Sequence, residues 1–127
     1  MIKSFFFKKK ESLLSPIYLN FLNDVLGVKP KDEHLYLEAI THASYKKSRK
    51  NIADNERLEF LGDAFISMAI GEYLFEKFPD KNEGFLSQLR AKVVSREQLN
   101  SLGKKIGLEN HILYQKSTNK YKSLIGN

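Results

Sequence analysis

Apolar residues recur at steps of three and four along most of the chain, which is the spacing of amphipathic α-helices. The pattern predicts five helical segments, over about residues 16–27, 32–44, 55–78, 85–94 and 95–107. The apolar face of the longest segment is supplied by Leu58, Leu61, Phe65, Met68, Ala69, Ile70, Leu74, Phe75 and Phe78. The sequence contains no β-hairpin signal and no internal repeat. We therefore expect an all-α fold.

Capping signals support the limits of these helices. Asp32 is placed to serve as an N-cap, and Ser95 with Gln98 three residues later has the spacing of a capping box. Pro79 ends the longest segment because proline cannot continue a helix. Gly107 closes the last segment, as glycine commonly does after a helix.

Two stretches lack the helical pattern. Residues 1–15, which include FFFKKK, are expected to form an N-terminal arm ahead of one domain over residues 16–127. Residues 45–55 are predicted to form an exposed basic loop that carries Lys46, Lys47, Arg49 and Lys50. The loop is either a solvated turn or an element that contacts phosphates. We favour phosphate contact, because the loop directly precedes an acidic helix.

Composition narrows the class of protein. The 127 residues are 42% hydrophobic and include nine Phe and six Tyr, which is enough for one domain with its own core. The absence of cysteine excludes disulfides, thiolate metal sites and cysteine nucleophiles. The N-terminus is too poor in apolar residues for a signal peptide, and no transmembrane run occurs. We expect a cytoplasmic protein without a membrane partner.

Charge is distributed unevenly along the chain. The net charge of +6 and the pI near 9.4 favour a polyanionic partner such as nucleic acid. Between Asp54 and Glu83, however, eight acidic and three basic residues give a net charge of −5, so the rest of the chain carries +11. An acidic segment within a basic protein indicates chemistry on the polyanion and not binding alone.

The acidic segment places three carboxylates on one predicted helix face. At about 100° per residue, Glu56, Glu59 and Asp63 fall within about 60° of one another. Like charges four residues apart destabilise a helix by roughly 0.2–0.5 kcal/mol per pair, and no Lys or Arg lies three or four positions away from these acids. Clustered carboxylates suit Mg²⁺ or Mn²⁺, which could activate water and stabilise a phosphodiester transition state.

The alternative interpretation is an ordinary solvated helix face. Phe60 speaks against it, because a large aromatic residue lies on the same side as the charges. Gly62 does so as well, since glycine costs about 0.8–1 kcal/mol relative to alanine in a helix interior and permits a close backbone approach. From spacing alone, both interpretations remain open.

The stretch NERLEFLGDA, residues 55–64, resembles the signature of the ribonuclease III family of double-stranded RNA endonucleases. Further matches occur in order: THAS precedes the signature, and EKFPD, EGFLSQLRAKVVSREQL and KSLIG follow it. The resemblance covers roughly residues 32–127. It implies an all-α, ribonuclease III-type endonuclease domain that acts as a homodimer. Such a dimer would hydrolyse both strands of an RNA duplex with Mg²⁺, leaving 5′-phosphates and a short 3′ overhang.

The resemblance also implies roles for individual residues. By motif position, Glu59 is a metal ligand, and Asp63 is a catalytic acid that also lies at the metal. Glu56 assists in the same stripe, and Glu83 corresponds to a further acidic site residue. Phe60 resembles the aromatic side chain that plugs a socket in the other subunit. The basic remainder would hold the duplex through phosphate contacts that do not depend on sequence.

The sequence departs from the family pattern at its end. The family has a second acidic pair, an Asp followed three residues later by a Glu. KSLIGN aligns so that Asn127 takes the Asp position as a metal ligand, and the chain stops before the Glu. The last apolar helix and the double-stranded RNA-binding domain of the family have no counterpart in this chain. We expect a fragment of a longer protein in preference to a degenerate member, because the break falls inside a motif.

Other polar residues have less specific patterns. His42 invites a general-base role, since imidazole titrates near neutral pH, but we expect a packing and hydrogen-bonding residue. His34 and His111 have no partners at ligand spacing. Two interpretations remain open for Ser87, Arg90 and Lys92: they line the groove that binds RNA, or they form an ordinary solvent-exposed face. Two functions therefore compete: an endoribonuclease whose turnover is weakened by missing ligands, and a non-catalytic module for RNA binding or dimerisation.

Overall fold

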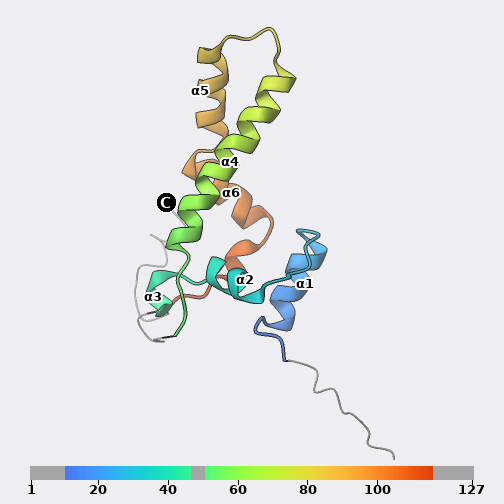
Figure 1. The fold of residues 1–127 in the computed structure, drawn as a ribbon, viewed down its shortest axis with the longest axis vertical. Helices are drawn as coiled ribbons and strands as arrows, with labels where there is room; N and C mark the ends of the chain where they lie inside the picture. Colours follow the sequence, from blue (N-terminus) through green and yellow to red (C-terminus); the bar gives the residue numbers. More distant parts are fainter. Residues whose placement is uncertain (1–10, 47–50, 116–127) are drawn as a thin grey trace, which may run out of the picture. The chain divides into compact units, whose positions relative to one another are not determined.

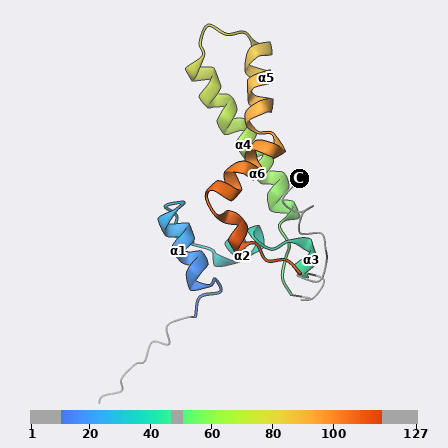
Figure 2. The ribbon, with the colours of Figure 1, turned by 180° about the vertical axis from the view of Figure 1, so that it is seen from behind.

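The computed structural model describes residues 11–46 and 51–115, without the side chain of Lys46 (Figures 1 and 2). Within them the regular elements are helices, in the order α1 (Pro16–Asp24), α2 (Glu33–Ala39), α3 (Ala43–Lys46), α4 (Glu56–Lys77), α5 (Glu83–Val93), α6 (Arg96–Lys105) and the 3-10 helix η1 (Leu108–His111). The predicted all-α class is confirmed. The chain forms two compact units, Met1–Leu37 and Glu38–Asn127.

Helix α1 supplies most of the core of the first unit. Ser15 caps it, since the Ser15 hydroxyl accepts the backbone N–H of Tyr18 at 3.2 Å. Pro16 takes the first helical position, where a missing N–H costs nothing. The buried side chains are Leu14, Tyr18, Phe21 and Leu22. Ile17, which the apolar spacing included in the predicted face, is 73% exposed, because Tyr18 takes the inward position.

Polar contacts complete the first unit. The Glu33 carboxylate accepts the hydroxyl of Ser12 at 2.9 Å and the backbone N–H of Leu13 at 2.6 Å. The Tyr18 hydroxyl donates to the backbone carbonyl of Tyr36 at 3.2 Å. Burial, and in second place the nearby Tyr36 phenol, raise the pKa of Tyr18 above its usual value of 10.0.

The helix predicted over residues 32–44 is interrupted. Asp32 accepts the backbone N–H of the second helical residue and starts α2 as expected, but α2 ends at Ala39. Thr41 then forms an isolated parallel β-bridge with Leu113. A backbone that gives its hydrogen bonds to a distant segment cannot continue the helical ladder. The prediction of one continuous helix was therefore wrong, and the chain resumes as the short helix α3.

Helices α4 and α5 form an antiparallel hairpin (Figures 1 and 2). The limits of α4 agree with the predicted segment 55–78. Asn82 caps α5 by accepting the backbone N–H of Phe85 at 3.0 Å, so α5 begins at Glu83, two residues before the predicted start. At the tip of the hairpin, the rings of Phe78 and Phe85 meet edge to face with centroids 5.6 Å apart.

Helix α6 begins and ends as predicted. The Ser95 hydroxyl accepts the backbone N–H of Gln98 at 3.3 Å, which is the first half of the expected capping box. Gly107 adopts the left-handed conformation with φ 81°, which only glycine takes without strain. Helix η1 follows, and the chain then reaches residues 112–115 beside α3 in both views (Figures 1 and 2).

Little of α4 is buried within this chain. Leu74 is its one buried side chain among the described residues. Within the described residues, the rest of the predicted apolar face is only partly buried, or it is exposed at Leu61, Phe65, Met68 and Phe75. No helix in the described part of the chain is both long and apolar enough to cross a membrane.

Candidate functional site

The acidic stripe occupies the first two turns of α4. Glu56 and Glu59 lie in the first turn and Asp63 one turn later, and all three side chains are exposed. The positive end of the helix dipole stabilises acids in the first turn, which gives Glu56 and Glu59 a structural reason to be there. The effect fades beyond that turn, so it does not account for Asp63.

Among the described residues, no cation neutralises the carboxylates of the stripe. Across residues 11–46 and 51–115, as far as their side chains are described, no lysine or arginine forms an ion pair with Glu56, Glu59 or Asp63. Arg57, the cation adjacent in sequence, points about 100° away from Glu56 around the helix. Within the part of the chain that the structure describes, the three carboxylates are exposed and have no cationic partner.

The start of α4 is anchored by backbone contacts. The N–H of Asn55 donates to the carbonyl of Thr41 at 2.9 Å, and the carbonyl of Asn55 accepts the N–H of Glu59 at 2.7 Å. The Asp54 carboxylate accepts the N–H of Glu56 at 3.3 Å and takes the role of a side-chain cap, which Asn55 does not perform. These contacts fix the turn from which Glu59 projects.

A divalent cation suits the donors of the stripe, although they form only part of a site. Mg²⁺ is commonly held by one or two carboxylates together with waters and substrate phosphates, and Glu59 with Asp63 supplies such a pair. No group of three or more His, Cys, Asp or Glu side chains that could hold a metal ion occurs among the described residues. Asn127, the third predicted ligand, lies outside them.

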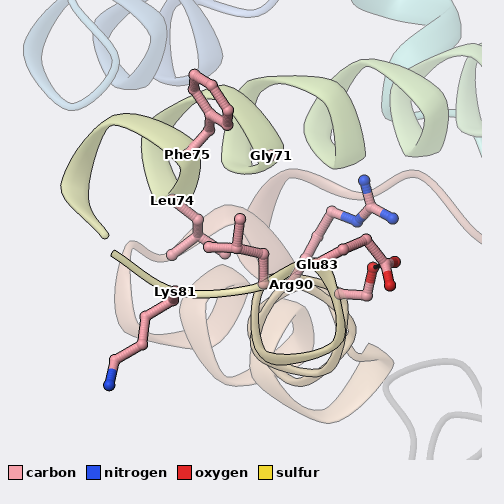
Figure 3. Close-up of a pocket in the computed structure, with 8 residues that line it drawn as sticks. Gly71, Leu74, Phe75, Lys81, Glu83 and Arg90 are labelled. Carbon is pink, nitrogen blue, oxygen red and sulfur yellow. Dashed lines mark hydrogen bonds between the residues drawn. The ribbon is translucent and has the colours of Figure 1, made fainter. Parts of the chain in front are cut away.

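Glu83 lies in a different place from the stripe. It sits in the first turn of α5, where its carboxylate accepts the Ser87 hydroxyl at 2.6 Å. It lines a pocket of about 510 Å³ between α4 and α5, to which Gly71 of α4 also belongs (Figure 3). Gly71 is twelve residues from Glu59 along α4, which is roughly 18 Å at ~1.5 Å per residue. A single chain therefore does not bring Glu83 to Glu59.

The pocket has an apolar wall on α4 and a mixed wall on α5, where Leu86 lies among polar residues. Leu74 and Phe75 belong to the first, and in Figure 3 the Arg90 side chain extends from α5 toward α4. A Cβ atom at Gly71 would lie 3.5 Å from an Arg90 guanidinium nitrogen. Lys81 points away from the other labelled residues (Figure 3). Ser87 and Arg90 therefore share a surface with Glu83, whereas the acidic stripe belongs to another part of α4.

Phe60 and its neighbours form an exposed apolar face on α4. The Phe60 side chain is 82% exposed, and Leu61, Phe65 and Met68 are each more than 60% exposed. An added Cβ at Gly62 would meet no atom within 4 Å. The close backbone approach that we expected at Gly62 therefore does not occur within the described chain. An exposed apolar surface of this kind is typical of an interaction site.

The remaining predicted residues divide into two groups. The side chain of Lys46, and Lys47, Arg49 and Lys50 entirely, lie outside the described residues. His42 is hydrogen bonded through Nδ1 to Ser44. Sequence patterns did not identify the contacts of Thr41, Ser44 and Asn55 that hold the start of α4. The motif THAS drew attention to this region, but its partners are distant in sequence.

Comparisons with known proteins point to one family. Residues 32–124 match the family model described as Ribonuclease-III-like. Ribonuclease 3 of Azobacteroides pseudotrichonymphae is 38% identical over 128 residues, which cover 99% of this chain and 47% of that protein. Ribonuclease 3 of a Sulfurovum species is 50% identical over 82 residues, which cover 65% and 35%. The chain thus spans about half or less of the length of these curated relatives.

A solved structure gives the same result for the fold. It is the nuclease domain of ribonuclease III from Campylobacter jejuni, described with structural flexibility in a region involved in dimer formation. The two structures are similar with a TM-score of 0.74 and 37% sequence identity, over 85% of this chain and 73% of that one.

Proposed function

Because the chain belongs to the ribonuclease III family, we propose that it carries the nuclease part of an endoribonuclease that cleaves double-stranded RNA with Mg²⁺. The observation that carries the proposal is the acidic stripe of α4, three exposed carboxylates without a cationic partner among the described residues. Three carboxylates repel the phosphates of a polyanion unless a metal ion lies between the carboxylates and the phosphates. The match over residues 32–124 supports the same conclusion.

Glu59 and Asp63 would hold the metal ion, with Mn²⁺ as a substitute for Mg²⁺ and the amide oxygen of Asn127 as a third donor. The bound ion would activate water and stabilise the charge of the phosphodiester transition state. The chain itself contributes two carboxylates one helical turn apart, on a turn that Asn55 fastens to the preceding segment. Glu56 adds negative charge to the same stripe. Glu83 would join this site only from a second copy, given its distance along α4.

The basic part of the chain would bind the duplex. Lys46, Lys47, Arg49 and Lys50 directly precede the acidic helix and would contact phosphates, independently of sequence. Cleavage of both strands requires two sites, and a homodimer supplies them by symmetry. The exposed apolar face around Phe60 supports such a dimer. Its products would be duplexes with 5′-phosphates and a short 3′ overhang.

A second candidate is a non-catalytic module for RNA binding or dimerisation. It is favoured by the finding that, within residues 11–46 and 51–115, no three His, Cys, Asp or Glu side chains lie together so that they could hold a metal ion. The experiment that separates the two candidates is incubation of the chain with a long RNA duplex and Mg²⁺, with Ca²⁺ as the control ion. Fragments with 5′-phosphates in Mg²⁺ alone would establish the nuclease. Duplex binding without cleavage in either ion would favour the module.

Variants of α4 test the roles within the site. Glu59→Ala or Asp63→Ala should abolish cleavage and leave duplex affinity nearly unchanged, because the carboxylates act on the reacting phosphate. Glu72→Ala is the matched control, an exposed acid on the same helix, and it should cleave at the wild-type rate. Weakened binding with retained cleavage in Glu59→Ala would refute the assignment.

The basic loop is tested through salt dependence. Replacing its four cations with alanine should weaken duplex binding and lower the slope of affinity against salt concentration by about one for each lost phosphate contact. Lys104 and Lys105, exposed at the end of α6, serve as the control pair. Equal losses in the loop variant and in the control would show a diffuse charge effect and not a contact.

A further inference from the structure

Residues 40–44, here called the strap, connect three segments that are distant in sequence. Its backbone pairs with residue 113 on both sides, since Leu113 N–H donates to the Ile40 carbonyl at 2.8 Å and His42 N–H donates to the Leu113 carbonyl at 2.9 Å. Its Thr41 carbonyl accepts the N–H of Asn55 at 2.9 Å. The strap therefore lies between the start of α4 and the segment that follows η1.

A chain of side-chain hydrogen bonds closes the strap. The Ser44 N–H donates to Nδ1 of His42 at 3.1 Å, so Nδ1 is an acceptor and the proton of the neutral ring is on Nε2. The Ser44 hydroxyl lies 2.8 Å from the same nitrogen and accepts the Gln115 N–H at 3.2 Å. In the tautomer whose proton is on Nε2, the hydroxyl donates its own proton to His42. Ser44 thus connects the imidazole to residue 115.

The strap is part of the core and not an exposed loop. The Thr41 side chain is 0% exposed and Ile40 is 6% exposed. A buried segment with satisfied backbone groups has little freedom to shift. Its contact with Asn55 continues into the acidic stripe, because the Asn55 carbonyl accepts the N–H of Glu59. Two successive backbone hydrogen bonds therefore connect the strap with Glu59.

We propose that His42 is a positioning residue for the carboxylates of α4. Its Nδ1, as the acceptor of the Ser44 N–H, keeps the strap closed on residues 113–115, and the closed strap holds the turn from which Glu59 projects. The ligand so served is a divalent cation, and this part rests on the proposed function. No contact of His42 with substrate is involved.

Two substitutions with opposite geometry test this role. In His42→Asn the amide oxygen can take the place of Nδ1, whereas in His42→Gln it reaches the place of Nε2. Gln is closer to His in size, so a role in packing alone would favour Gln over Asn. Ser44→Ala removes the hydroxyl and leaves the ring in place.

Hydrogen exchange at single backbone amides measures whether the hydrogen bonds of the strap are formed, and it requires no activity assay. Exchange at Leu113, Gln115 and Glu59 should be faster in His42→Gln and Ser44→Ala, and near wild type in His42→Asn. Nitrogen NMR of the wild-type ring should show the neutral form protonated at Nε2. Protonation at Nδ1, or equal rescue by Gln and Asn, would overturn the proposal.

The effect of the His42 variants on the carboxylates of α4 is measured as the affinity for Mn²⁺ alone, monitored by water proton relaxation. Loss of a group that orients a metal ligand commonly weakens metal affinity by 10- to 100-fold, so we expect roughly a tenfold loss in His42→Gln and recovery in His42→Asn. An opened strap with unchanged Glu59 exchange and unchanged Mn²⁺ affinity would refute positioning. If the wild type takes up no Mn²⁺, the proposed function fails, and Glu59 exchange still decides whether the strap controls α4.

Discussion

Phe60→Ala should affect dimerisation strongly and the folding stability of the single chain very little. The Phe60 ring is 82% exposed, so its removal should change the free energy of unfolding of the monomer by less than about 0.5 kcal/mol. Burying an exposed Phe side chain is worth about 1.5–3 kcal/mol. A twofold dimer buries two copies, so the variant should weaken dimerisation by about 3–6 kcal/mol. At about 1.4 kcal/mol per tenfold, the dissociation constant rises by roughly two to four orders of magnitude.

The assay combines sedimentation equilibrium with chemical denaturation at concentrations where the chain is monomeric. Phe75→Ala is the matched control, an exposed Phe on the same helix at 72% exposure, more than four turns away from Phe60. It should have a smaller effect on dimerisation. Leu74→Ala is the opposite control, because Leu74 is 4% exposed and its loss should cost about 2–5 kcal/mol of monomer stability.

Two results would refute this reasoning. If Phe60→Ala lowers monomer stability as much as Leu74→Ala does, the Phe60 side chain is buried in the monomer and not exposed. If the wild type remains monomeric at high concentration, or Phe60→Ala and Phe75→Ala weaken the dimer equally, Phe60 has no specific place in the interface.

Three further predictions concern stability and are measured by denaturation. Gly62→Ala should stabilise the monomer by about 0.8–1 kcal/mol, because an added Cβ meets no atom within 4 Å. Gly107→Ala should destabilise the monomer by about 1–2 kcal/mol, since φ is 81° there. A stabilising Gly107→Ala with a destabilising Gly62→Ala would contradict both geometries. Asn82→Ala should cost about 1 kcal/mol through loss of the α5 cap, and an unchanged midpoint would contradict the cap. Burial and Tyr36 raise the pKa of Tyr18 in the folded chain, so Tyr18 contributes stability that is fully present below pH 10.0 and is lost as the pH rises through the higher folded-state pKa. Tyr18→Phe should remove this alkaline dependence, and an unchanged pH profile would contradict it.

The sequence alone determined most helix limits, because helix formation depends on neighbouring residues. Proline after residue 78 ends α4, Ser95 caps α6 and Gly107 follows it, and each acts over a few positions. The motif NERLEFLGDA likewise identified the family, which the match over residues 32–124 confirms. The three acids of the stripe shared a face by helical spacing alone.

Only the tertiary structure decided which distant segments contact one another and which side chains they cover, because the periodicity of apolar residues holds no information on either. The predicted helix over residues 32–44 breaks because Thr41 pairs with Leu113, a partner that no local pattern reveals. The apolar spacing of α4 predicted a buried face, yet Leu61 and Phe65 are each more than 60% exposed, because spacing shows which residues share a side and not what covers it. Glu83 is acidic like the stripe, but it lies on α5 and lines a pocket with Gly71, which is on another stretch of α4. Hydrogen bonds and packing between distant segments set these positions, and they depend on the path of the whole chain.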